Sequence, residues 1–437
     1  MIDIINKILW AIATVFIVVY SLYYTFYLFF IQFDFKRMIR EILKKNNGEK
    51  GLTPFQALMM TLGGRIGVGS IAGVSLAIYI GGVGSLFWLF TISFFTAILA
   101  FAETVLGIKY REYNGSLYNG GPSYYIKNGL KNRRLGSIYA IIIIISYIGG
   151  FLGIQANTIV KSLGNIIFVP NYIIGIIIVL ITLFIIFGGI KKIADVTSKI
   201  VPFMCAFYLL IAIYVFIVNI DIMPNILFNV IKSAFNFESF IGGFIATFIV
   251  GIQRGIFSSE AGLGTGSIAA STSGGTSSVS QGYIQMFGIY ITSFVICGST
   301  AIIILTSNYQ QFLFNDINGI EIANHAFKYH LGNIGNIVLF LFILLFSFST
   351  ILTGYYYSES SLKYFFNKIN NIYIILLKII TLIVLFIGSI ISSTTLWALV
   401  DILVAIMAII NLYALVKLKK EVKNELIYYK KRKYDKI

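Results

Sequence analysis

Charged residues are scarce in this sequence, and their scarcity excludes most classes of protein. They make up 11% of the 437 residues, whereas hydrophobic residues make up 58%; soluble domains carry about 25% charged residues. The two cysteines, Cys205 and Cys297, both lie inside apolar runs and form neither a disulfide framework nor a metal-binding spacing. The two histidines, His325 and His330, lack an acidic partner pattern, and no P-loop occurs. The sequence therefore disfavours a metal site and direct use of ATP.

Long apolar runs of about 20 residues alternate with short polar loops, and this is the length that a helix needs to cross about 30 Å of hydrocarbon. Outer-membrane barrels show short alternating segments instead. The first run, 8–33, has no charge and no cleavage site behind it, so we interpret it as a retained span. The sequence predicts an all-α polytopic membrane protein of about 11 transmembrane helices. The expected spans are 8–32, 55–79, 85–108, 137–160, 172–190, 200–220, 240–270, 282–306, 333–358, 371–390 and 394–416.

Basic residues gather in alternate loops, which is the topology signal of a membrane protein. Most of the 33 lie in five cytoplasmic segments by this rule: 33–54, 109–134, 191–199, the loop with Lys363 and Lys368, and the tail from 417. We therefore predict an inner-membrane protein with its N-terminus outside and its C-terminus in the cytoplasm. The basic tail is expected to rest on anionic membrane lipids. No motif supports binding of nucleic acid.

Two spans are interrupted by glycine. The second reads TLGGRIGVGSIAGV and the seventh reads GIQRGIFSSEAGLGTGSIA. Each is followed by four ordinary spans, so 55–220 and 240–418 are expected to form two five-helix halves of opposite orientation. Residues 1–54 then form an extra helix with a basic linker, and 419–437 form the tail. Paired breaks point to a transporter's binding site, although glycines that only let helices pack closely are the alternative.

A broken helix exposes N–H groups at one half-helix end and C=O groups at the other. The N–H end attracts a carboxylate and the C=O end attracts a cation. An amino acid with a monovalent cation is therefore the expected cargo. Gly67, Val68, Gly69 and Ser70 are expected to supply backbone groups for it.

Six blocks of sequence resemble the alanine/glycine:cation symporter family, in the family's order and over about 50–418. They are FQALMMTLGGRIGVGSIAGVSLAIYIGGVGSLFW, AFAETVLGIKYRE with GGPSYYIKNGL, GIQANTIV, GGIKKIADVTSKIVPFM, GIQRGIFSSEAGLGTGSIAAS and YYYSESSLKY. The resemblance implies the LeuT-like 5+5 inverted-repeat fold. It also implies import of a small neutral amino acid, alanine, glycine or in some members glutamine, with sodium.

The same resemblance implies roles for individual residues. The family's buried glutamine falls on Gln155 and its threonine on Thr350, both as contacts to the substrate; Gly255 in the second broken span joins them. Sodium is expected at Val68, Ser349 and Thr350. Without the family resemblance, the alternative interpretation is that Gln155 forms a hydrogen bond between two helices and that the Thr350 hydroxyl donates to a backbone carbonyl of the preceding turn.

Four positions depart from the family pattern. GTGN reads GVGS here, which places Val68 and Ser70 where the family has a hydroxyl and an amide. Gly354 stands where the family usually has a tryptophan, and this change is expected to enlarge the side-chain pocket. Thr292 stands where the family usually has an aspartate. Arg65 precedes the glycines. A fixed cation there offers a substitute for bound sodium, which would give a sodium-independent or proton-coupled carrier or an exchanger.

Few charges lie inside the predicted spans, and each is a functional candidate by default because buried charge is costly. Arg254 and Glu260 flank the second break and are interpreted as a pair that gates the site or holds the fold. Glu103 is interpreted as a structural ion-pair partner of Lys109 and Arg111. Lys378 and Asp401 complete the set.

The sequence thus predicts a secondary amino-acid transporter that works by alternating access. A channel is the alternative from another class, because a channel need not carry a filter motif such as TVGYG. An enzyme is disfavoured because no His/Asp/Glu cluster lies at the interface. The exact substrate, the coupling ion and the oligomeric state stay open.

Overall fold

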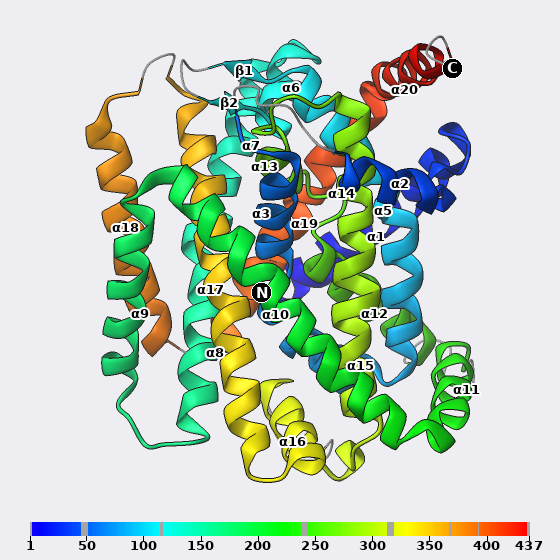
Figure 1. The fold of residues 1–437 in the computed structure, drawn as a ribbon, viewed down its shortest axis with the longest axis vertical. Helices are drawn as coiled ribbons and strands as arrows, with labels where there is room; N and C mark the ends of the chain where they lie inside the picture. Colours follow the sequence, from blue (N-terminus) through cyan, green and yellow to red (C-terminus); the bar gives the residue numbers. More distant parts are fainter. Residues whose placement is uncertain are drawn as a thin grey trace.

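The computed structural model describes residues 2–44, 51–113, 117–236, 243–312, 319–366, 369–391 and 393–434. This part of the chain is almost entirely helical (Figure 1). The helices up to the middle of the chain are α1 (Ile2–Tyr27), α2 (Phe35–Leu43), α3 (Pro54–Arg65), α4 (Ala72–Gly81), α5 (Gly84–Lys109), α6 (Pro122–Asn128), α7 (Arg133–Ser146), α8 (Leu152–Gly164), α9 (Asn171–Ile186), α10 (Gly189–Val218) and α11 (Met223–Ala234). Those that follow are α12 (Ile245–Ser259), α13 (Gly266–Ala270), α14 (Ser278–Tyr290), α15 (Gly298–Leu305), α16 (Gly319–Leu331), α17 (Ile334–Lys363), α18 (Asn371–Ile390), α19 (Ser393–Lys417) and α20 (Lys419–Tyr434).

Short elements complete the chain. The strands β1 (Glu112–Tyr113) and β2 (Tyr118–Asn119) pair as an antiparallel hairpin. The short 3₁₀ and π segments are η1 (Ile31–Phe33), η2 (Val68–Ser70), η3 (Tyr147–Phe151), η4 (Ile220–Ile222), η6 (Ile291–Cys297) and η7 (Tyr309–Phe312). The π segments η3 and η6 join α7 to α8 and α14 to α15, so each of these pairs is one long helix with a local bulge.

Among the described residues, eight helices are long and apolar enough to cross a membrane, and three shorter apolar helices accompany them. The predicted all-α polytopic class is confirmed. The count of 11 spans stays a prediction, because two of the short apolar helices, α4 and α12, belong to interrupted spans and α9 has only 16 residues.

Both predicted interruptions are present in the structure. The first span consists of α3, η2 and α4, with the helix broken after Arg65; the second consists of α12 and α13, with the chain unwound over 260–265. The start of α3 is fixed locally, because Thr53 and Gln56 form a capping box around Pro54 in the first turn. Because α3 begins at a fixed residue and ends at Arg65, its last carbonyls lie at the break.

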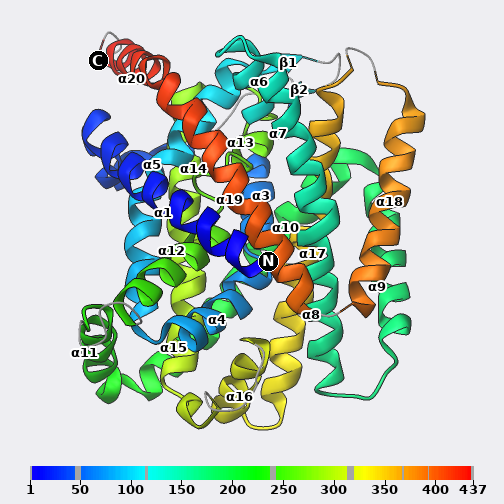
Figure 2. The same ribbon diagram turned by 180° about the vertical axis from the view of Figure 1, so that it is seen from behind.

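The two ends of the molecule differ. The helices α2, α6 and α20 and the β1–β2 hairpin lie at one end, and α11 and α16 lie at the other (Figures 1 and 2). Helix α1 crosses the back of the bundle obliquely and packs on α19 (Figure 2). Two hydrogen bonds fasten it there, from Trp10 Nε1 to the Asp401 carbonyl (3.0 Å) and from the Tyr24 hydroxyl to the Leu415 carbonyl (2.6 Å).

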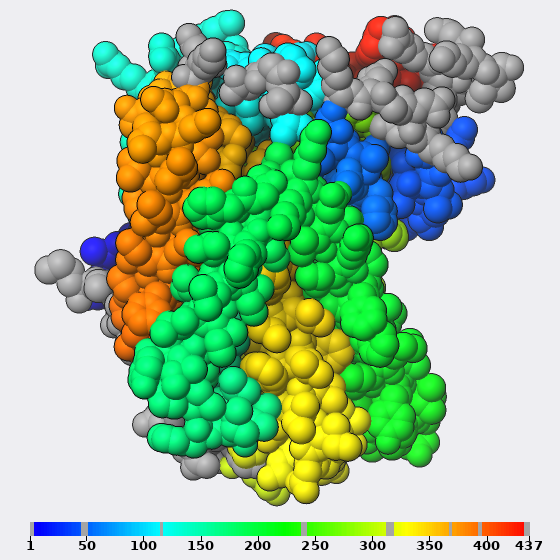
Figure 3. All heavy atoms as spheres, turned by 60° about the vertical axis from the view of Figure 1, so that its left-hand side comes forward, coloured from blue at the N-terminus to red at the C-terminus, as the bar shows by residue number. Residues whose placement is uncertain are grey.

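The flank of the molecule is apolar. Helices α9, α10 and α18 lie on one face, beside and above the segment that contains α16 and the start of α17 (Figure 3). Their exposed side chains include Phe184, Leu210 and Ile383. A contiguous exposed apolar surface of this kind is what a helix bundle presents to lipid.

Candidate functional site

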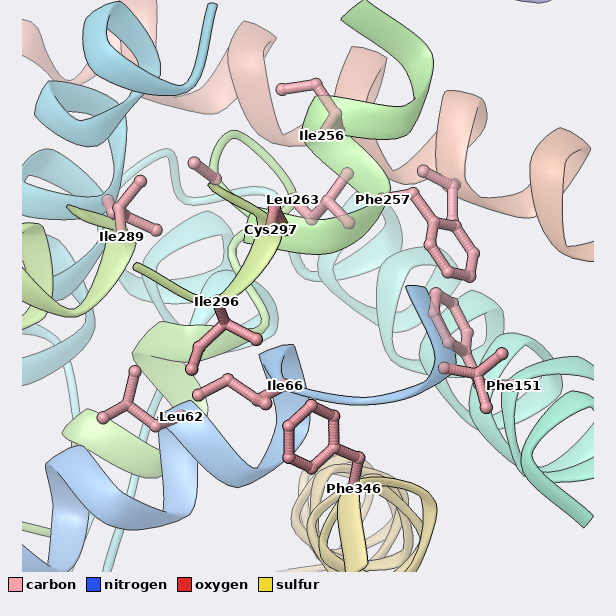
Figure 4. Packing of buried hydrophobic residues seen from close by; sticks show 14 of the residues in the cluster. Leu62, Ile66, Phe151, Ile256, Phe257, Leu263, Ile289, Ile296, Cys297 and Phe346 are labelled. Carbon is pink, nitrogen blue, oxygen red and sulfur yellow. The ribbon is translucent and has the colours of Figure 1, made fainter. Parts of the chain in front are cut away.

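The first break brings together residues from three helices. A methyl group at Gly67 would lie 2.5 Å from Thr350 Oγ1 on α17 and 3.2 Å from both amide atoms of Gln155 on α8. Glycine is therefore required at this position for close approach, not for its dihedral angles. Figure 4 shows the chain leaving the helix at Ile66, near Phe346, and running unwound toward Phe151 and Phe257.

Gln155 binds the unwound backbone directly. Its Oε1 accepts a hydrogen bond from the Val68 N–H at 3.1 Å, and its side chain is buried. The amide nitrogen still has its donors for a further group. The structure thus places Gly67, Val68, Gln155 and Thr350 at one point, although they lie far apart in sequence.

Oxygen atoms cluster at the last carbonyls of α3. Thr350 Oγ1 lies 2.9 Å from the Gly63 carbonyl oxygen, 3.3 Å from that of Gly64 and 3.1 Å from that of Phe346. Ser349 Oγ lies 3.1 Å from the Gly63 carbonyl oxygen and 2.9 Å from that of Phe346. Two hydroxyls have two hydrogens for these five contacts, so the cluster is rich in acceptor oxygen. A half-helix C-terminus that exposes carbonyls is a typical site for a monovalent cation in broken-helix transporters.

Val68 is not part of this oxygen cluster among the described contacts. Its backbone N–H faces Gln155, on the amide side of the break. The predicted sodium ligands Ser349 and Thr350 do meet, and the carbonyls beside them come from Gly63 and Gly64 instead. The sequence reading missed these two carbonyls because a backbone oxygen leaves no mark on residue type.

Two further carbonyls of the first break are held by hydroxyls from the second half. Ser258 Oγ donates to the Gly69 carbonyl at 3.0 Å, and Thr300 Oγ1 donates to the Ser70 carbonyl at 2.8 Å. A methyl group at Gly69 would lie 2.7 Å from the Phe257 ring. The segment η2 is therefore fixed against α12 and α15.

The second break is held by Glu260, which takes the left-handed conformation (φ 54°) at the end of α12. The Tyr147 hydroxyl donates to its Oε1 (2.7 Å) and Thr265 Oγ1 donates to its Oε2 (2.9 Å). The interpretation of Glu260 and Arg254 as a pair is wrong. Arg254 forms its ion pair with Asp401 on α19, at 3.0 Å between Nη2 and Oδ2.

Glu103 also differs from its predicted role. It accepts a hydrogen bond from Asn411 Nδ2 (2.7 Å), and the backbone N–H groups of Gly262 and Gly264 in the second break interact with it. It therefore supports the second break from α5, while Lys109 pairs with two glutamates of α20. The error arose because neighbours in sequence at a helix end were taken as neighbours in space.

Arg65 is buried, and its guanidinium lies against α13 and α14. Its Nη1 donates to the Gln285 carbonyl at 3.3 Å, and methyl groups at Gly266 and Gly288 would lie 2.4 and 3.1 Å from its guanidinium nitrogens. Two glycines on α13 and α14 thus make room for this side chain. Gly63, two residues earlier, faces α17 instead.

Two predicted substrate glycines have packing contacts. A methyl group at Gly255 would lie 3.1 Å from the Leu89 carbonyl oxygen, so this glycine lies against α5 as a close-packing residue. The enlarged pocket expected at Gly354 is absent there, because the Tyr147 ring and Leu152 occupy the space, each 2.8 Å from a methyl group at that position. Sequence alone did not reveal that a tyrosine from another helix fills the volume of the missing tryptophan.

An aromatic stack, which the sequence reading missed, runs beside both breaks. Tyr147 stacks on Phe151 with ring centroids 4.8 Å apart, Phe151 on Phe257 at 5.1 Å, and Phe257 contacts Trp397 at 4.8 Å (Figure 4 shows Phe151 and Phe257). It links η3, the segment between α7 and α8, to α12 and α19. With 38 phenylalanines and 28 tyrosines in the chain, no sequence signal singles these out.

Comparisons with known proteins place the chain in a family. A family model described as the sodium:alanine symporter family matches residues 1–436. The chain is 34% identical to the amino-acid carrier protein AlsT of Bacillus subtilis, over 94% of this chain and 88% of that protein. It is 32% identical to the probable sodium/glutamine symporter GlnT of the same organism (98% and 90%) and 32% identical to the sodium/proton-dependent alanine carrier protein of Bacillus sp. PS3 (88% and 89%).

The fold also resembles that of a solved transporter. The crystal structure of a manganese transporter mutant from Eremococcus coleocola aligns with a TM-score of 0.50 at 13% identity, over 83% of this chain and 76% of that chain. This likeness bears on the fold alone, and it supports the LeuT-like arrangement.

Proposed function

Because the chain belongs to the sodium:alanine symporter family, we propose that it imports a small neutral amino acid by symport with a cation, as a secondary transporter and not an enzyme. The observation that carries the proposal is the convergence of Gln155 and Thr350 on Gly67, at the point where α3 is broken. A channel needs no such paired, hydrogen-bonded interruptions.

The amino acid is proposed to bind between the two breaks. Its carboxylate would be bound by N–H groups of the unwound segment around Val68–Ser70, at the start of α4. In this structure the Val68 N–H donates to Gln155 and the Ser70 N–H to the Gly67 carbonyl, so these two would exchange partners when the carboxylate binds. The Gln155 amide would hold one of its charged groups. The substrate's side chain would then lie beside the Phe151–Phe257 part of the aromatic stack, which favours alanine or glycine over larger residues because Tyr147 fills the space beside Gly354.

Sodium is proposed as the coupling ion, bound by the oxygen cluster of Gly63, Gly64, Phe346, Ser349 and Thr350. The cluster joins α3 of the first half to α17 of the second, so a bound cation would hold the two halves in one arrangement. Rocking of one half against the other would release both cargoes, in alternating access. Arg65, which faces α14, is proposed to tune the charge of the site and not to occupy the sodium position.

The protein is proposed to lie in the inner membrane, with its basic end in the cytoplasm. That end carries α2, α6 and α20 (Figure 1), whose sequences include many of the basic residues. By the positive-inside rule the C-terminus is cytoplasmic and the N-terminus is outside. Helix α20 would rest on anionic lipids there. The halves 55–220 and 240–418 are proposed as the two inverted repeats.

The sodium site is tested by removing its hydroxyls singly. We expect Thr350→Val and Ser349→Ala each to raise the sodium concentration for half-maximal alanine uptake about tenfold, since one lost ligand worth about 1.4 kcal/mol changes affinity tenfold. Ser347→Ala is the matched control, because its hydroxyl is buried on the same helix without a hydrogen-bond partner among the described residues. An unchanged sodium requirement in both variants would remove the oxygen cluster as the sodium site.

A further inference from the structure

The charges buried around the two breaks do not balance. Arg254 and Asp401 neutralise each other as an ion pair. Arg65 is the remaining arginine, and it interacts electrostatically with two carboxylates, Glu260 and Glu103. All three side chains are at most 3% exposed. Burial of an unneutralised charge costs several kcal/mol, so one carboxylate needs a cation or a proton.

The described partners of Glu103 favour its ionised form. Asn411 Nδ2 donates to its Oε1 at 2.7 Å, and the backbone N–H groups of Gly262 and Gly264 also interact with it. An amide N–H can donate and cannot accept, whereas a protonated carboxyl needs an acceptor for its own hydrogen. Glu103 is therefore the carboxylate whose partners favour the ionised form, and Arg65, which interacts with both glutamates, can balance only one of the two charges.

Glu260 has partners of a different kind. Both of its described side-chain hydrogen bonds come from hydroxyl groups, those of Tyr147 and Thr265. A hydroxyl reverses from donor to acceptor by rotation about its C–O bond. Glu260 can therefore gain a proton, donate it to Tyr147 or Thr265, and keep both contacts.

We propose that Glu260 is a proton-binding site within the unwound segment between α12 and α13, and that its protonation is coupled to amino-acid binding. The inference rests on the proposed symport function and assigns a proton to the same transport cycle. The carboxylate takes one proton from solvent when the amino acid binds, and releases it on the cytoplasmic side with the substrate. No other bond changes.

The groups that surround Glu260 fit a site that changes its charge. Arg65 on α3 interacts with it electrostatically, as do the phenols of Tyr357 on α17 and Tyr139 on α7, and the Tyr147 hydroxyl contacts it directly. The Tyr357 hydroxyl is buried without a hydrogen-bond partner among the described residues, and so is Arg65 Nε. These unpartnered donors offer contacts to an ionised Glu260 in another state of the cycle.

The first test uses proteoliposomes that contain a pH-sensitive dye, with equal sodium on both sides and the membrane potential clamped at zero. Alanine added outside is expected to acidify the interior with the wild type and with Glu260→Asp, and not with Glu260→Gln. Radiolabelled alanine is followed in parallel. Entry of alanine without acidification by the wild type would overturn the proposal, and so would full acidification by Glu260→Gln. If no neutral amino acid enters at all, the proposed symport function fails as well.

The second test needs no transport. Protonation coupled to binding predicts that the alanine affinity of the purified wild type falls by up to about tenfold for each pH unit on the alkaline side of the transition. In Glu260→Gln the affinity is expected to be independent of pH. A variant with the same pH dependence as the wild type would overturn the proposal.

Replacement of Glu260 and of Glu103 by glutamine, one at a time, gives a control for folding. Glu260→Gln retains both hydroxyl contacts, so its thermal unfolding midpoint is expected to stay near that of the wild type. Glu103→Gln replaces one acceptor oxygen by an NH₂ group beside N–H donors, Asn411 Nδ2 among them, and is expected to lower the midpoint clearly. Equal destabilisation of the two variants would contradict the distinction drawn between these carboxylates.

Discussion

Gly67→Ala is expected to reduce alanine uptake by about 5- to 150-fold, or to abolish it. The added methyl group would lie 2.5 Å from Thr350 Oγ1, closer than real Cβ contacts, and 3.2 Å from the Gln155 amide, which is tighter than most of them. Overpacking of this kind costs about 1–3 kcal/mol, which corresponds to that range in an equilibrium constant. The cost falls on three elements that we propose to bind the substrate, so radiolabelled uptake and alanine binding are the measurements.

Gly73→Ala is the matched control. It lies on the same interrupted span, in α4, but its methyl group would approach only Ser258 Oγ, at 3.8 Å, an ordinary contact. Alanine also favours a helix over glycine by up to about 1 kcal/mol. We expect Gly73→Ala to transport normally. If both variants behaved alike, the close approach at Gly67 would not be part of the binding site.

Removal of one partner of the buried pair Arg254–Asp401 is expected to destabilise the protein by about 3–5 kcal/mol. The two side chains are 6% and 5% exposed, and Trp397 covers the guanidinium with its ring 5.2 Å away. Asp401→Asn leaves the Arg254 charge without a counter-charge between α12 and α19. The measurement is thermal or denaturant unfolding of the purified protein, read beside uptake.

Two comparisons sharpen this prediction. The pair Lys127–Glu112 is exposed, at 27% and 44%, and Glu112→Gln is expected to change stability by no more than about 1 kcal/mol. The double variant Arg254→Met/Asp401→Leu removes both charges and is expected to recover much of the stability that Asp401→Asn loses. If Asp401→Asn were as stable as Glu112→Gln, the buried pair would have no role in holding α12 to α19.

The sequence predicted the fold class and the two breaks because their signals are local. Twenty-residue apolar runs and glycine clusters act through chain length and backbone freedom. Gln155 and Thr350 were found through a family resemblance, and the structure brings them together at Gly67.

The partners of the buried charges could not be predicted in this way. Asp401 lies 147 residues from Arg254, and nothing in residue type says that α12 packs on α19. Glu260, six residues from Arg254, was the nearer choice and the wrong one. The prediction of an enlarged pocket at Gly354 was wrong for a similar reason, since Tyr147, which lies outside α17, fills the space beside this glycine. Each of these contacts depends on which helices pack against each other, and the composition of the sequence does not reveal this.

The central claim is that this protein couples entry of a small neutral amino acid to a cation gradient. Uptake of radiolabelled alanine, glycine and glutamine into proteoliposomes tests it most directly, with an inward sodium gradient and then with equal sodium on both sides at one pH. We predict accumulation of alanine above the external concentration with the gradient, and only equilibration without it. Accumulation that ignores both the sodium and the proton gradient, or entry of none of these amino acids, would contradict the account.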